Sequence, residues 1–128
     1  IGNATKLAGE VIIDDNAIIR STVLMHQFCR IGGYTMVQGG SRASKDIPPY
    51  IIAGREPIAY CGLNLVGLRR RGFSNELIEN IHNTYRIIYQ SGKNVTEALK
   101  QVREEIPMTP EIEYIVSFIE NSQRGIIR

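Results

Sequence analysis

The sequence predicts a left-handed parallel β-helix built from hexapeptide repeats, followed by a small all-α domain. The first observation is that residues 1–48 divide into eight successive hexapeptides. The first position of every hexapeptide is apolar: Ile1, Leu7, Ile13, Ile19, Met25, Ile31, Val37 and Ala43. The fifth position is small or β-branched: Thr5, Val11, Ala17, Val23, Cys29, Thr35, Ser41 and Ile47. Neither helical spacing nor strand alternation keeps register over this length, whereas a short internal repeat indicates a β-helix.

Three hexapeptides are expected to form one coil, with one flat side for each hexapeptide. The first position points inward and stacks on its equivalent in the next coil, about 4.8 Å away, the spacing of neighbouring strands. The left hand is inferred from the repeat class, since parallel crossovers in other folds are strongly right-handed.

The chain is expected to divide into three parts: β-helix coils over residues 1–50, a connection with a short helix over 51–72, and a helical domain over 73–128. Pro48 and Pro49 are expected to end the repeat, because proline has no N–H to donate to a strand ladder. Residues 50–62 then resemble an irregular connection broken by Gly54, Pro57 and Gly62. A short helix follows over 65–71 and ends at Gly72.

Three longer helices are predicted from apolar stripes and capping residues. Ser74 is the expected N-cap of the first, and Thr109 followed by Pro110 the N-cap and first residue of the third. The three stripes are Leu77, Ile78, Ile81, Tyr85, Ile88 and Tyr89; Val95, Ala98, Leu99 and Val102; and Ile112, Ile115, Val116 and Ile119.

Composition bounds the function classes. A chain of 128 residues forms one or two small domains. A net charge of +2 is too weak to indicate nucleic-acid binding, and no apolar run is long enough to span a membrane. Cys29 and Cys61 do not form a disulfide framework, which together with the absence of a signal peptide predicts a cytoplasmic protein. Because the chain opens in phase with the repeat, it is expected to be the carboxyl-terminal part of a longer protein.

Two histidines need an explanation. His26 lies at the second position of its hexapeptide, where it is either a solvated or structural side chain or a ligand contact or proton carrier. Its neighbour Gln27 has an amide that could orient a substrate. His82 lies off the apolar stripe of its helix and is expected to be solvated. Two histidines and separated thiols do not match a zinc ligand set, so no metal is expected.

The run Arg69–Arg71 has three open interpretations: a solvated basic face at a helix end, a phosphate clamp, or a surface for an acidic protein partner. Asn64 lies earlier on the same expected helix and could contact a base or a ribose. Gly39 and Gly40 mark either a bend or a gap in which a chain-like ligand can lie.

Five segments together resemble the acyl-[acyl-carrier-protein]–UDP-N-acetylglucosamine O-acyltransferases: HQFC at 26–29, DIPPY at 46–50, GLRRRGFS at 67–74, YQSGK at 89–93 and RGIIR at 124–128. The resemblance implies that a (R)-3-hydroxyacyl group is transferred from acyl carrier protein to the 3-hydroxyl of UDP-N-acetylglucosamine, the first step of lipid A biosynthesis. It also implies a homotrimer with active sites between neighbouring subunits, no cofactor, and a match to the carboxyl-terminal half of such an enzyme.

The same resemblance assigns roles to individual residues. It places His26 and Gln27 in the substrate site, assigns Asn64, Arg70 and Arg71 to the uridine and phosphates, and makes Gly39 the position that limits acyl length. The histidine that acts as general base belongs to a motif upstream, so no catalytic residue is assigned to this chain. Four positions depart from the family pattern and put local contacts in doubt: Glu10, Gln38, Pro57 and Val66.

Two other functions stay open. One is a non-catalytic hexapeptide scaffold that binds a nucleotide sugar or a partner. The other is the related N-acyltransferase of the same pathway, against which the LRRRGFS string at 68–74 argues.

Overall fold

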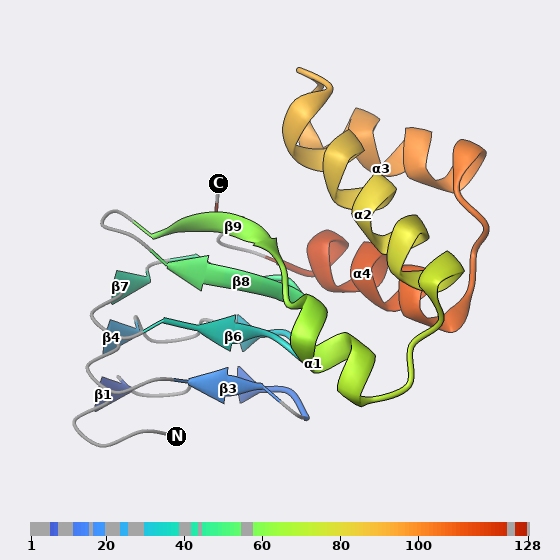
Figure 1. The fold of residues 1–128 in the computed structure, drawn as a ribbon. Helices are drawn as coiled ribbons and strands as arrows, with labels where there is room; N and C mark the ends of the chain where they lie inside the picture. Colours follow the sequence, from blue (N-terminus) through green and yellow to red (C-terminus); the bar gives the residue numbers. More distant parts are fainter. Residues whose placement is uncertain are drawn as a thin grey trace.

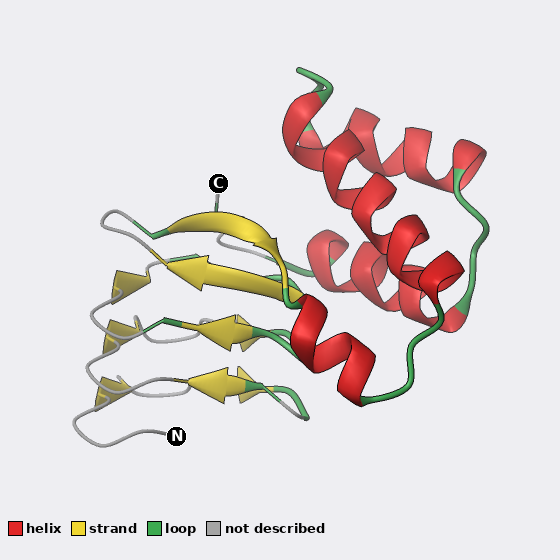
Figure 2. Ribbon diagram, in the orientation of Figure 1, coloured by secondary structure: helices red, strands yellow, loops and turns green. Residues whose placement is uncertain are grey.

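The computed structural model describes residues 6–7, 12–15, 17–19, 24–25, 30–38, 42–43, 45–54, 58–122 and 125–127. Short strands form one part of the molecule and helices the other, with the short helix α1 between them (Figures 1 and 2). The strands are β1 (Lys6–Leu7), β2 (Ile12–Ile13), β3 (Ile18–Ile19), β4 (Leu24–Met25), β5 (Arg30–Ile31), β6 (Met36–Val37), β7 (Arg42–Ala43), β8 (Ile51–Gly54) and β9 (Ala59–Leu63). The helices are α1 (Leu65–Arg70), α2 (Asn75–Gln90), α3 (Val95–Glu105) and α4 (Pro110–Glu120).

Strands β1–β8, which we call the coil stack, form three parallel sheets. The sheets have the orders β1-β4-β7, β2-β5 and β3-β6-β8. Strands β1 to β4 therefore each pair with the third strand after them, whereas β6 pairs with the second strand after it, β8. Leu7 is paired with Met25, and Met25 with Ala43. The partners in each pair are three hexapeptides apart, which confirms the predicted step from one coil to the next. Ile31 and Val37, both at first positions, are fully buried.

The last level of the coil stack takes a shorter path than the levels before it. Ile31 is paired with Ile47, and Val37 with Ala53, so each step falls short of three full hexapeptides. Ile47 was expected at a fifth position but is fully buried in the column of first-position residues. The hexapeptide phase predicted over 43–48 is therefore wrong, because the chain takes a tighter path into the next side.

Pro48 and Pro49 do not end the stacking, contrary to expectation. They lie in a turn, where a missing N–H removes no ladder hydrogen bond. The Pro48 carbonyl accepts a hydrogen bond from Thr35 Oγ1 at 2.7 Å, and the Pro49 carbonyl accepts one from the Tyr85 hydroxyl at 2.6 Å. Gly32 lies beneath this turn, and a Cβ there would collide with Pro49 backbone atoms.

The expected irregular connection over 50–62 is also wrong. Strand β8 continues the third sheet in parallel, and β9 then pairs with β8 in the antiparallel direction. The chain also returns to the coil stack near its end: Ile126 forms a parallel bridge with Asp46. The Asp46 N–H donates to Gly125 O at 3.0 Å, and the Ile127 N–H donates to Asp46 O at 2.9 Å.

The longer helices begin at capping residues. Ser74 and Thr109 cap α2 and α4 as predicted, and Asn94 caps α3; each accepts a hydrogen bond from a backbone N–H in the first turn of its helix. Most stripe residues are buried, but Val95 is 43% exposed because it lies at the first position of α3. Phe118, which is outside the predicted stripe, is 1% exposed.

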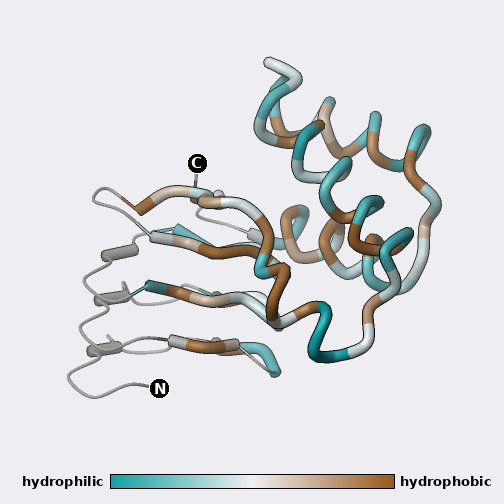
Figure 3. The backbone as a smooth tube through the Cα atoms, in the orientation of Figure 1, coloured by the Kyte–Doolittle hydropathy of each residue, from teal (hydrophilic) through white to brown (hydrophobic). Residues whose placement is uncertain are grey.

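One continuous hydrophobic cluster extends from Ile31 in the coil stack to the helices and Ile127. Figure 3 shows polar and apolar segments alternating along the helices and an apolar stretch in β8. Tyr85 of α2 is fully buried, and burial raises its pKa well above the ordinary value. Among the described residues, no helix is both long and apolar enough to cross a membrane. The division at residues 50 and 72 stays a prediction.

Candidate functional site

Helix α1 is held on the coil stack by Asn64, the residue that precedes it. Asn64 is the N-cap of α1 rather than a member of the helix, and it is only 3% exposed. Its Oδ1 accepts a hydrogen bond from the Gly67 N–H at 3.3 Å, and its Nδ2 donates to Tyr34 O at 2.9 Å. A Cβ on Gly67 would collide with this amide. Asn64 therefore positions α1, and its contact with a nucleotide stays a prediction.

The arginines lie at the exposed end of α1. Leu68 is fully buried and anchors the helix, whereas Arg69, Arg70 and Arg71 are exposed. Within the part of the chain that the structure describes, none of the three pairs with a carboxylate. Val66 is 62% exposed, and it shares a helix face with Arg70 because the two are four residues apart. One exposed face of α1 thus presents an apolar side chain and a guanidinium group that is available to phosphate.

An aromatic cluster supports the residues that follow α1. The rings of Tyr34, Tyr50 and Phe73 lie with centroids 5.5–5.7 Å apart. Tyr34 and Tyr50 lie at equivalent turns of successive levels, and both have left-handed backbone, with φ of 58° and 70°. The Arg71 guanidinium carbon lies 5.9 Å from the centre of the Tyr34 ring. The segment from Arg71 to Phe73 is therefore docked on the turns of the coil stack.

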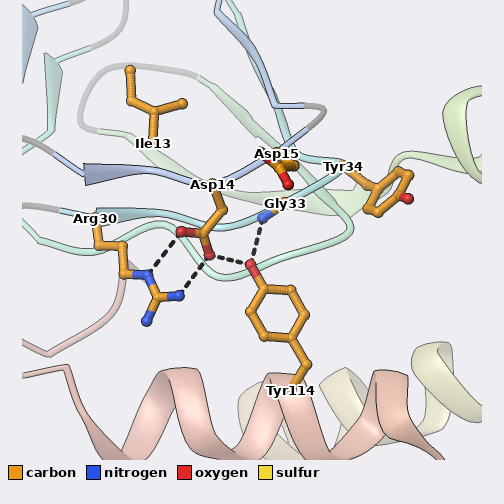
Figure 4. A pocket seen from close by; sticks show the side chains of 7 residues that line it. All are labelled: Ile13, Asp14, Asp15, Arg30, Gly33, Tyr34 and Tyr114. Carbon is orange, nitrogen blue, oxygen red and sulfur yellow. Dashed lines mark hydrogen bonds and ion pairs between the residues drawn. The ribbon is translucent and has the colours of Figure 1, made fainter.

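A second group of polar side chains connects the coil stack to α4 at a cavity of about 490 Å³ (Figure 4). Arg30 binds the Asp14 carboxylate in a two-pronged contact, Nε to Oδ1 at 3.1 Å and Nη2 to Oδ2 at 2.8 Å. The Tyr114 hydroxyl donates to Asp14 Oδ2 and accepts from the Gly33 N–H at 2.8 Å. Figure 4 shows Arg30 and Tyr114 converging on Asp14, while the Tyr34 ring points away.

The electrostatics of this group are those of a closed network. Burial and then the hydrogen bond to Asp14 raise the pKa of Tyr114 to about 12. The hydrogen bond to Asp14 raises the pKa of Arg30, whose guanidinium also lies 4.7 Å from the centre of the Phe118 ring. The Asp14 carboxylate and the Tyr114 hydroxyl both have partners within the protein, so the network fixes α4 on the coil stack. Asp14 and Arg30 have opposite charges and lie nearly one coil apart in the sequence, which is a weak sequence signal for their contact. No feature of the sequence indicated that Tyr114 would join them.

Several predicted site residues lie outside the described part of the chain: Glu10, His26, Gln27, Gly39 and Pro57. Gln38 is described and exposed; its N–H donates to Ala53 O at 2.9 Å. Its side chain covers Gly54, where a Cβ would collide with Oε1. His82 is exposed on α2. No group of three His, Cys, Asp or Glu side chains that could hold a metal is present among the described residues.

Comparisons with known proteins give one family. Residues 46–127 match the model for domain 2 of UDP N-acetylglucosamine O-acyltransferase. The acyl-[acyl-carrier-protein]–UDP-N-acetylglucosamine O-acyltransferases of Pseudomonas aeruginosa and Alkalilimnicola ehrlichii are each 39% identical to the chain over 126 residues. These matches cover 98% of this chain and 49% of those proteins, so the chain spans about half the length of the relatives.

Solved structures agree with this result. The UDP-N-acetylglucosamine acyltransferase of Bacteroides fragilis is 75% identical, with a TM-score of 0.98 over all of this chain and 50% of that one. The enzyme of Francisella novicida is 37% identical, with a TM-score of 0.93 over 99% of this chain and 47% of that one. The chain therefore belongs to the UDP-N-acetylglucosamine O-acyltransferase family.

Proposed function

We propose that this chain is the carboxyl-terminal half of an enzyme that transfers a (R)-3-hydroxyacyl group from acyl carrier protein to the 3-hydroxyl of UDP-N-acetylglucosamine, the first step of lipid A biosynthesis. The observation that carries the proposal is the family match over residues 46–127, which includes α1 and its arginines. The relatives with 39% identity are named as O-acyltransferases of an acyl-[acyl-carrier-protein] and UDP-N-acetylglucosamine.

The exposed arginines support a role in holding the sugar nucleotide. A diphosphate carries negative charge and planar sets of oxygens, which guanidinium groups bind in two-pronged contacts. Arg70 and Arg71 are exposed and have no carboxylate partner among the described residues. We assign these two residues to the diphosphate. We keep His26, Gln27 and Asn64 as substrate-binding residues and Gly39 as the residue that limits acyl length.

The chemistry requires one base. It takes the proton of the sugar 3-hydroxyl while that oxygen attacks the thioester carbonyl, and the carrier thiol then leaves. His82, the histidine that the structure describes, is exposed on α2 and belongs to neither α1 nor the coil stack. We propose that a histidine upstream of Ile1 is the base, because the sequence resemblance places the general base in an upstream motif.

We propose a homotrimer of left-handed β-helices. Ile18 of β3 and Leu65 and Val66 of α1 are between 39% and 62% exposed, although each is a large apolar side chain. Exposed apolar groups of this kind support contact with another subunit. The free thiol of Cys61 suits a reducing compartment, and we propose the cytoplasm.

Turnover by the full-length protein tests the function. UDP-N-acetylglucosamine is incubated with hydroxyacyl carrier proteins of several chain lengths, and released carrier thiol is measured together with the mass of the sugar product. The expected product loses its acyl group in mild alkali, because an ester is cleaved where an amide is not. The N-acyltransferase reaction needs a free amine, which the acetylated nitrogen of this sugar does not offer, so a parallel assay supplies a UDP-glucosamine acceptor with a free 2-amine. An alkali-stable product formed only with that acceptor would instead assign the N-acyltransferase reaction. Nucleotide-sugar binding without turnover at any length would indicate a non-catalytic scaffold.

A further inference from the structure

We propose that Tyr34 is a positioning residue for Arg71, and that its ring holds the guanidinium ready for a phosphate of the sugar nucleotide. This inference rests on the proposed function, in which Arg71 contacts the diphosphate. It concerns a residue on the coil stack that is distant in the sequence from the arginine that it contacts.

The backbone of Tyr34 gives the first argument. Its φ of 58° lies in the left-handed region, which favours glycine and asparagine and is strained for a tyrosine. The conformation is held by backbone bonds on both sides: the Tyr34 N–H donates to Asp15 O at 3.2 Å, and Tyr34 O accepts from Asn64 Nδ2 at 2.9 Å. The turn would therefore be satisfied by a smaller residue, so the aromatic ring needs a separate explanation.

The contacts of the Tyr34 ring explain why an aromatic residue stands at this turn. Tyr50 stacks on Tyr34 with centroids 5.7 Å apart and planes 23° apart, and Phe73 approaches at 5.5 Å. Arg71 lies over the same ring at 5.9 Å. Arg71 and Phe73 flank Gly72, whose φ of 82° turns the chain there. Both sides of that turn therefore rest on one aromatic surface.

The geometry suits an arginine that must bind an anion. A guanidinium placed over a ring face makes its cation–π contact through its flat side. The N–H groups at its edge stay free to form two-pronged hydrogen bonds with phosphate oxygens. A side chain held in this way loses less conformational entropy when the phosphate arrives. Arg70 has no such aromatic contact among the described residues, which makes it the natural comparison.

Steady-state kinetics of the full-length enzyme test the proposal with four variants. Tyr34→Asn keeps a residue suited to left-handed backbone and removes the ring, whereas Tyr34→Phe keeps the ring. The other two are Arg71→Ala and the double variant Tyr34→Asn/Arg71→Ala. We expect Tyr34→Asn to raise KM for UDP-N-acetylglucosamine about two- to fivefold, the range of an exposed cation–π contact. Its kcat and its KM for the acyl carrier protein should stay at the wild-type values, and Tyr34→Phe should match wild type in all three.

The double variant separates an effect of Tyr34 through Arg71 from a general disturbance of the local structure. If Tyr34 acts through Arg71, removing the ring from Arg71→Ala changes nothing further, so the two effects do not add. Tyr34→Leu, which keeps apolar bulk without an aromatic face, repeats the test should Tyr34→Asn fold poorly, and the same KM rise is expected. Additive effects, or a wild-type KM in Tyr34→Asn, would overturn the positioning role. An unchanged KM in Arg71→Ala would instead remove the arginine from the proposed nucleotide site.

Discussion

Arg70 and Arg71 are neighbours in the chain but have different surroundings. Arg70 lies in the last turn of α1, on the face that also presents Val66, and contacts no ring among the described residues. Arg71 is the C-cap of α1 and lies over Tyr34. Both are exposed, so replacing either should disturb folding little.

Because both arginines are assigned to the diphosphate, we expect Arg70→Ala and Arg71→Ala to weaken binding of UDP-N-acetylglucosamine without disturbing the fold. The loss of one charged hydrogen bond to a phosphate costs about 1.5–3 kcal/mol. Isothermal titration calorimetry of each full-length variant with the sugar nucleotide measures this loss of binding free energy. Arg86→Ala, an exposed arginine of α2, is the matched control and should bind as wild type. If both α1 variants bind like this control, the arginines belong to a carrier-protein surface or a solvated face.

The length of acyl chain that the enzyme accepts is predicted, from the sequence resemblance alone, to depend on Gly39. If Gly39 limits acyl length, as the family resemblance implies, a methionine in its place would occupy space that part of the hydrocarbon tail needs. Each methylene excluded from its pocket forfeits about 0.8 kcal/mol of burial. Gly39→Met should therefore lose activity on long acyl chains and keep it on short ones, as turnover on a ladder of hydroxyacyl carrier proteins will measure. An identical length profile would place the limit elsewhere, with Gln38 over Gly54 the next position to change.

At the scale of elements, α4 is attached to the coil stack through both apolar and polar contacts. Ile112, Ile115 and Val116 are fully buried on one side of the helix. Tyr114 projects from it to Asp14 and Gly33. The apolar side supplies burial free energy without direction, and the hydrogen bonds fix where along the stack the helix lies.

Tyr114→Phe is expected to lower the free energy of unfolding by about 1–3 kcal/mol, because the buried Gly33 N–H loses its acceptor. The midpoint of urea unfolding measures this loss. Ser117→Ala, on the same helix but with an exposed hydrogen bond, is the control and should change the value by less than about 0.5 kcal/mol.

Alkaline pH gives a second measurement on the same variant. The pKa of Tyr114 is raised from 10.0 to about 12, so the folded protein keeps the hydroxyl proton over a range in which the unfolded chain loses it. The contribution of Tyr114 to stability is complete below pH 10 and is lost as the pH rises toward 12. The wild type should therefore lose more stability between these values than Tyr114→Phe does. Equal losses in the two proteins would contradict the assigned pKa.

The helical elements were predictable because their signals are local. Ser74 and Thr109 are preferred N-cap residues whose hydrogen bonds form within the first turn of their own helices, and the stripes of α2 and α4 specify which face is buried. The first levels of the coil stack were predictable because one hexapeptide predicts the next. The shortened last level was not, because Ile47 and Ala53 reach the core through a turn whose path depends on Gly32 and on Tyr85 of a distant helix.

The candidate site was predictable only in its residue types. Three arginines and an asparagine suggested an anion site, yet Asn64 uses its amide within the protein, to cap α1 and to bind Tyr34 O. Tyr34 carried no sequence signal, because a tyrosine with left-handed backbone is selected by contacts that form only in the folded protein.

At the scale of the whole molecule, the exposed apolar side chains on β3 and α1 predict association. Contact with another subunit would remove these apolar side chains from water. We expect the full-length protein to be a trimer, so light scattering should give three times the mass of one chain. An active, stable monomer would show that no active site is shared between subunits.

The segments that cover the last level of the coil stack also affect whether coils of another molecule can add to it. A parallel stack exposes, at its final level, strand edges onto which another chain could add coils without limit, as in a fibre. Here β9 covers one such edge in the antiparallel direction, and residues 125–127 cover another. An incoming parallel coil finds these two edges already hydrogen-bonded. The same segments that complete the fold therefore also cover two of the strand edges to which a parallel coil could otherwise add.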